Sequence, residues 1–188
     1  MENLAKRTFW RDAAKSGLAI GLMVVFLDYL SVLFAQPGGR LATVLSILGI
    51  AAMAYFMYLF SRRRSELSGD AGYSFGQAMG FIMAMMLFAG FVWGLGYYFL
   101  YNFIKPELLA ELVDKAVGIV EETRNYGLLE QTEKMGYALY GNVIFMTFSG
   151  IVRMVILGSI LGLFVTPFVK RLPEVAAPND NEDTEDEQ

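Results

Sequence analysis

Four long apolar segments dominate the chain. They cover about residues 16–35, 41–60, 74–104 and 140–168. The third is free of charged residues between Ser74 and Ile104. At about 1.5 Å per residue, a helix of that length exceeds the roughly 30 Å thickness of a hydrocarbon core. The pattern therefore predicts an all-α polytopic membrane protein whose spans form a four-helix transmembrane bundle.

The connections between the segments differ in length and character. The first, at residues 36–40, contains a proline and paired glycines, which predict a tight turn and a helical hairpin. The third, about residues 105–139, opens with Pro106 at a helix N1 position, and apolar residues recur at helical spacing over 108–120. We expect one amphipathic extracytoplasmic helix here, ending near residue 126. It would lie on the membrane or cap the bundle; a docking surface for an envelope partner is the alternative.

The two ends of the chain are polar. Residues 1–15 combine Phe9 and Trp10 with basic side chains, which is typical of a cytoplasmic segment at the membrane interface. A cleaved signal peptide is the alternative for the first segment, but Asp28 interrupts its apolar run. Residues 172–188 contain no apolar side chain after Pro178 and end in an acidic run, which predicts a disordered acidic cytoplasmic tail. The membrane domain is thus expected at residues 16–171.

The distribution of lysine and arginine predicts the orientation. Basic residues precede the first segment and follow the second and fourth: Lys6, Arg7, Arg11, Lys15, Arg62, Arg63, Arg64, Lys170 and Arg171. The first connection holds only Arg40, and the third has four basic against seven acidic residues. Because basic loops stay in the cytoplasm, both termini are expected there. Arg62, Arg63 and Arg64 are interpreted as a topology anchor with some affinity for anionic lipid, and nothing supports nucleic-acid binding.

Composition excludes most catalytic chemistry. The chain has no cysteine and no histidine, which removes thiolate and imidazole metal sites, cysteine nucleophiles and every Ser-His arrangement. The remaining Asp, Ser, Lys and Tyr residues form no recognisable nucleophile and base. We therefore expect no enzyme and no cofactor or metal. A hydrolase acting through Ser149 or Ser159 is the least favoured alternative.

Only two ionisable residues lie deep within the apolar segments, Asp28 and Arg153. Each is costly there, by about 2.5 to 3.5 kcal/mol on insertion scales, so each needs a partner or water. Counted from the cytoplasmic edge, they lie at depths of roughly 16 and 22 Å. A candidate buried ion pair that fixes helix register follows. The alternatives are a proton or anion site in a transport path, and an Arg153 that binds a lipid phosphate.

Glycines mark faces where helices can approach closely. In the third segment Gly76, Gly80, Gly90 and Gly94 fall with two larger residues within about 40° of one line. In the first segment Asp28 shares a small-residue face with its glycines and should point into the bundle. The predicted packing positions are Gly17, Gly21, Gly76, Gly80, Gly90, Gly94, Gly158 and Gly162. The pattern does not separate contacts within the chain from contacts between chains.

Three motifs carry a resemblance. The motifs are Phe9-Trp10-Arg11 with Lys15 and Gly17, GYSFGQA at residues 72–78, and YNFIKPE at residues 101–107. They resemble domain-of-unknown-function family 4199, a group of uncharacterised membrane proteins common in Bacteroidota. The likeness covers about residues 7–171. It implies a multi-pass protein of the bacterial inner (cytoplasmic) membrane, with four spans and an outer loop between the third and fourth. It implies no activity and no catalytic residue.

Abundant packing signal and little chemistry favour a structural or interaction component. Such a protein would self-associate as a homo-oligomer or join a larger membrane complex, with the lipid bilayer as its surroundings. The alternative is a small transporter or channel subunit that uses Asp28 and Arg153.

Overall fold

The computed structural model describes residues 2–34, 40–68, 72–122 and 126–171. Its elements are helices in the order α1 (Glu2–Phe34), α2 (Arg40–Glu66), α3 (Phe75–Phe99), the π-helix η2 (Leu100–Ile104), α4 (Pro106–Glu122), the short 3₁₀ helix η3 (Tyr126–Leu128), α5 (Leu129–Tyr140) and α6 (Val143–Val169). Four helical stretches are long and apolar enough to cross a membrane: Thr8–Phe34, Thr43–Glu66, Phe75–Ile104 and Val143–Val169. The all-α, four-span prediction is confirmed. The predicted turn at 36–39 and the acidic tail lie outside the described residues.

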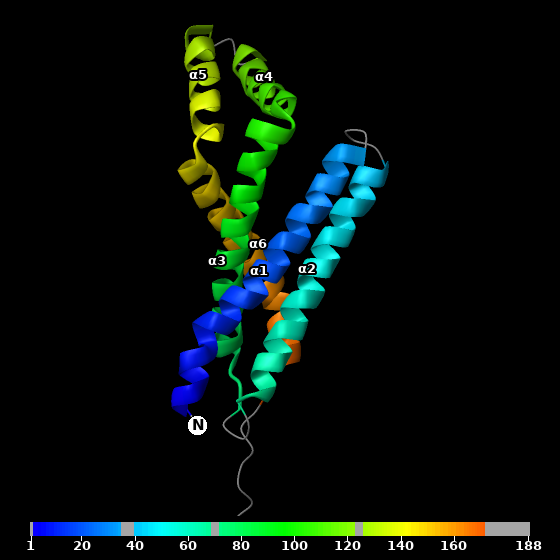
Figure 1. The fold of residues 1–188 in the computed structure, drawn as a ribbon, viewed down its shortest axis with the longest axis vertical. Coiled ribbons are helices and arrows are strands. Elements are labelled where there is room, and N and C mark those ends of the chain that lie inside the picture. Colours follow the sequence, from blue (N-terminus) through cyan, green and yellow to red (C-terminus); the bar gives the residue numbers. More distant parts are fainter. Residues whose placement is uncertain (1, 35–39, 69–71, 123–125, 172–188) are drawn as a thin grey trace, which may run out of the picture.

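Helix α3 is the core of the bundle. It packs most extensively against α6 and then against α1, while α2 packs mainly on α1 and α6 (Figure 1). Its buried residues include Phe81, Ile82, Met85 and Met86, whereas α1, α2 and α6 expose large apolar side chains. Exposed apolar faces around a buried central helix suit a protein whose solvent is lipid.

The two ends of the bundle carry different features. We call the end at Thr8, Glu66, Phe75 and Val169 the basic end, and the opposite end, which carries α4 and α5, the hairpin end (Figure 1). At the basic end, the segment expected at residues 1–15 is not separate from the first span. From Glu2 onward it belongs to α1, which is one helix of 33 residues.

The GYSFGQA motif builds the entry into α3. Gly72 has a φ of 74°, a left-handed conformation that glycine adopts without strain. Ser74 and Gln77 form a capping box, in which the Gln77 N–H donates to Ser74 Oγ (3.2 Å) and the Ser74 N–H to Gln77 Oε1 (2.9 Å). Tyr73 exchanges two backbone hydrogen bonds with Arg171 (2.9 and 3.0 Å), which ties the start of α3 to the end of α6. Burial there raises the pKa of the Tyr73 hydroxyl to about 12.

The connection between α3 and α6 contains two helices where one was expected. α4 follows η2 directly and pairs with α5 (Figure 1). The pairing is close at Gly136, where an added Cβ would lie 2.9 Å from Val113 Cγ2. Asn142 caps α6, accepting hydrogen bonds from Ile144 N–H (2.9 Å) and Phe145 N–H (3.2 Å).

Candidate functional site

Asp28 is bound to the central helix. Its Oδ2 accepts hydrogen bonds from Trp93 Nε1 and Tyr97 Oη, each at 3.0 Å. The two donors are one turn apart on α3, and their rings lie 4.0 Å apart between centroids. Trp93 is only 5% exposed. The carboxylate therefore joins α1 to α3 through two aromatic donors, and its bonds satisfy both of their polar groups inside the bundle.

Arg153 of α6 contacts the same tryptophan. Its guanidinium carbon lies 4.6 Å from the centre of the Trp93 ring, a cation–π contact. The direct ion pair expected between Arg153 and Asp28 is not formed between these two described residues: Asp28 bonds the edge of Trp93 and Arg153 covers its face. The reason is that α1 and α6 each pack on α3, so an α3 side chain contacts both charged groups.

Asp28 and Arg153 nevertheless line one cavity of about 480 Å³. Ser46 and Gly49 of α2 contribute to its wall, and most of the remaining lining is apolar. Such a cavity can accept a group that hydrogen-bonds to a guanidinium. Among the described residues there is no cluster of acidic side chains that could hold a metal ion.

Six of the eight predicted glycines lie at helix contacts. Gly17 meets the Met85 carbonyl and Gly21 the Ala89 backbone, so α1 and α3 run in the same direction where they pack, and Asp28 continues the same face toward Trp93. Gly158 and Gly162 of α6 contact Met86 and Met79.

Gly90 and Gly94 form the closest approach between α3 and α6. An added Cβ at Gly90 would lie 2.7 Å from the Gly150 carbonyl oxygen, and one at Gly94 2.6 Å from Thr147 Cα. By contrast, a Cβ at Gly76 or Gly80 would meet no atom within 4 Å. The predicted glycine line is thus packed at one end of α3 and open at the other.

The YNFIKPE motif has a structural role. Asn102 Nδ2 donates to the Tyr98 (3.0 Å) and Tyr140 (3.3 Å) carbonyls, which joins η2 to the end of α5. Lys105 Nζ donates to the Val32 carbonyl (3.0 Å), which joins the start of α4 to α1. Sequence reasoning used this motif only as a family signature, although its two polar side chains next to a predicted helix end were a signal for such contacts.

The sequence pattern of the family described as Protein of unknown function (DUF4199) matches residues 15–171. The chain belongs to this family. The match includes all of α2 to α6 and most of the first span. No curated protein and no solved structure matches the chain.

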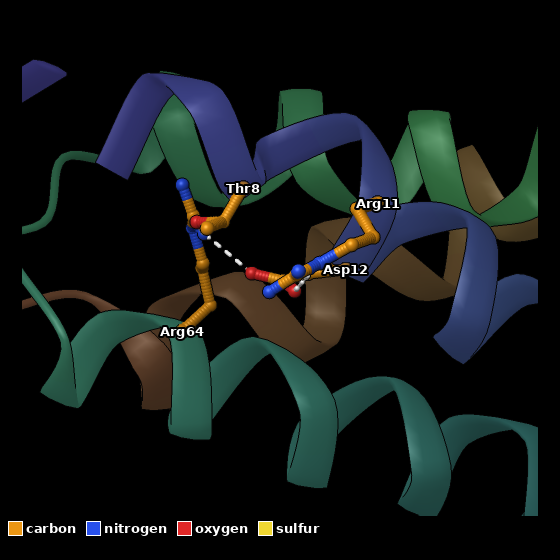
Figure 2. Close-up of polar contacts among 4 residues, drawn as sticks. All are labelled: Thr8, Arg11, Asp12 and Arg64. Carbon is orange, nitrogen blue, oxygen red and sulfur yellow. Dashed lines mark hydrogen bonds and ion pairs between the residues drawn. The ribbon is translucent and has the colours of Figure 1, made fainter. Parts of the chain in front are cut away.

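This DUF4199 protein has a second polar cluster, at the basic end. Arg64 Nη1 donates to Asp12 Oδ2 (2.8 Å) and Thr8 Oγ1 (2.9 Å), which joins α2 to α1 (Figure 2). The guanidinium also lies within 6 Å of the Phe9 and Phe81 ring centres, and Arg64 is only 8% exposed.

Sequence reasoning missed this cluster because it treated Arg62, Arg63 and Arg64 as one exposed anchor. The four-residue spacing of Thr8 and Asp12 places both on one helix face and was the available signal.

Proposed function

We propose that this DUF4199 protein is an interaction component of the bacterial inner membrane that self-associates or joins a membrane complex through the open face of α3. We define the open face by Gly76, Gly80, Met83 and Leu87. Both termini would lie in the cytoplasm, which places this face in the cytoplasmic half of the bilayer.

The observation that carries the proposal is the split of the glycine line. Gly90 and Gly94 pack on α6, but nearer the basic end α6 contacts Met79, Ile82 and Met86 instead. Because two packed helices cross at an angle, α6 leaves the glycine line toward the basic end. The open face therefore lies beside the contact between α3 and α6 and is not covered by α6. Its Met83 and Leu87 side chains are about 40% exposed.

The open face differs from the other lipid-facing surfaces of the chain. α2 and α6 present large side chains such as Ile47 and Phe164, which fill space against acyl chains. Gly76 and Gly80 instead leave a depression along α3, and a small-residue depression lets a second helix approach closely in a bilayer. Asp28 supports a structural role over a transport role, because its two hydrogen bonds link α1 to α3 within the chain.

Filling the depression tests this function. We expect Gly80→Leu to abolish association without destabilising the monomer, because a Cβ added at this position would meet no neighbouring element within 4 Å. Gly118→Leu on α4, which is equally open, is the matched control. The measurement is native mass spectrometry of the tagged protein in mild detergent.

A crosslinking experiment identifies the contact directly. The chain has no cysteine, so Met83→Cys places a single thiol on the open face and Phe164→Cys places one on a face of α6. We expect oxidative or bismaleimide crosslinking in membranes from Met83→Cys only. A strictly monomeric protein with no co-purifying partner and no Met83→Cys crosslink would refute the proposal.

A transporter or channel subunit is the second candidate, favoured by the shared cavity of Asp28 and Arg153. If the cavity conducts, Arg153→Gln protein that accumulates normally in membranes should lose flux. Proteoliposomes loaded with a pH-sensitive dye or a chloride-sensitive dye measure this. Wild-type protein that moves neither protons nor chloride faster than empty vesicles would count against this candidate.

A further inference from the structure

A basic pocket of about 420 Å³ lies between α1 and α2 at the basic end. Its charged lining consists of Arg11, Asp12, Lys15, Arg63 and Arg64, so four cations surround one carboxylate. Its apolar lining comes from Ala19, Phe60, Leu67 and Phe81. The pocket therefore has an excess of positive charge above an apolar wall.

The single carboxylate is already engaged. Asp12 bonds the buried Arg64 at 2.8 Å, and its other oxygen lies 4.0 Å from Arg11 Nε (Figure 2). Lys15 and Arg63 are exposed, and neither has a hydrogen bond or ion pair with any residue that the structure describes. The unneutralised charge of the pocket thus belongs mainly to these two side chains.

The position of the pocket along the helices selects the class of ligand. Arg63 lies three residues before the end of the second span, and Asp12 lies four residues after the start of the first. The charged side chains are therefore at headgroup depth. Ala19 lies four residues after Lys15 and Phe60 lies three residues before Arg63, so each is about one turn further into its span, at the depth where acyl chains begin. A ligand with an anionic head and an apolar tail matches both levels.

We propose that this pocket binds the phosphate of an anionic phospholipid, with Lys15 and Arg63 as the phosphate-binding residues. Charge-assisted hydrogen bonds from ammonium and guanidinium groups suit phosphate oxygens. Arg64 and Asp12 are positioning residues, because their bond holds α1 and α2 at the separation that forms the pocket. A zwitterionic lipid carries its own cation beside the phosphate and gains less from this site.

Lipid retention tests the proposal on the full-length protein. The protein is placed in nanodiscs of equimolar phosphatidylglycerol and phosphatidylethanolamine, released into mild detergent and analysed by native mass spectrometry. We expect wild type to retain phosphatidylglycerol in preference, and the double variant Lys15→Gln/Arg63→Gln to bind it about thirtyfold more weakly. The conservative exchange Lys15→Arg/Arg63→Lys should keep binding.

The matched control is Arg62→Gln/Lys170→Gln. It removes the same charge at the same end of the bundle, but Arg62 and Lys170 line a different pocket. We expect this variant to retain phosphatidylglycerol like wild type. Equal loss in both double variants would show an unspecific charge effect and overturn the proposal, as would equal retention of the two lipids by wild type.

Inorganic phosphate distinguishes a lipid site from a free-phosphate site. Because the apolar wall favours a tail, millimolar inorganic phosphate should not displace bound phosphatidylglycerol. Displacement at that concentration would overturn the assignment to lipid. Circular dichroism of the Lys15→Gln/Arg63→Gln protein should match wild type, since neither side chain supports the fold through a polar bond.

Discussion

Replacing Gly150 with leucine is expected to separate α3 from α6 and to cost about 3 kcal/mol or more of folding free energy. A Cβ at this position would lie 2.6 Å from the Gly90 carbonyl oxygen and 2.7 Å from Gly94 Cα. Both atoms belong to the backbone, so no flexible side chain can move aside. The two helices must part or shift along each other.

The measurement is the unfolding midpoint in detergent, followed by circular dichroism. Gly118→Leu again serves as control, because a Cβ at Gly118 meets nothing within 4 Å. A Gly150→Leu protein that unfolds at the wild-type midpoint would contradict the close α3–α6 approach. The variant also separates two properties: Gly150→Leu should destabilise the monomer, whereas Gly80→Leu should affect association alone.

Replacing Asp28 with leucine is expected to destabilise the bundle by about 2 to 4 kcal/mol, because it leaves two donors without an acceptor. Trp93 Nε1–H and Tyr97 O–H both lose the bond to Asp28 Oδ2. Water cannot replace the carboxylate at this depth as easily as it would at a soluble surface. Asp28→Asn keeps an acceptor oxygen and should lose less.

A mutant cycle isolates the hydrogen bonds from the change in side-chain shape. In a Trp93→Phe/Tyr97→Phe background the donors are gone, so Asp28→Leu should cost little further stability. Reversible unfolding in mixed micelles provides the free energies. If Asp28→Leu is equally destabilising in both backgrounds, the carboxylate stabilises the bundle by some means other than these two bonds.

The glycine pattern shows which part of a packing prediction sequence can support. Spacing places Gly76, Gly80, Gly90 and Gly94 on one line, because the angle per residue is a local property of the helix. Whether a neighbour follows that line depends on the crossing angle of the second helix. Here α6 covers Gly90 and Gly94 and misses Gly76 and Gly80.

The pairing of Asp28 with Arg153 shows a similar division. Counting residues along each helix estimates the depth of a charged group, and both charged groups do line one cavity. Counting cannot tell which third side chain lies at that depth. Trp93 on α3 contacts both residues and replaces a direct ion pair with a hydrogen bond and a cation–π contact.

Sequence alone determined the four spans, their apolar character and the small-residue faces, because hydrophobicity and helical periodicity are local and strong in a lipid solvent. Tertiary structure alone decided the second outer helix, the Arg64–Asp12 link, the Trp93 bridge and the open half of the α3 face. The second outer helix, α5, carries a weaker apolar pattern than α4 and has no buried residue among those described, so local periodicity did not reveal it. The other three depend on how helices far apart in sequence cross, and a crossing angle is a property of two packed surfaces rather than of either helix by itself.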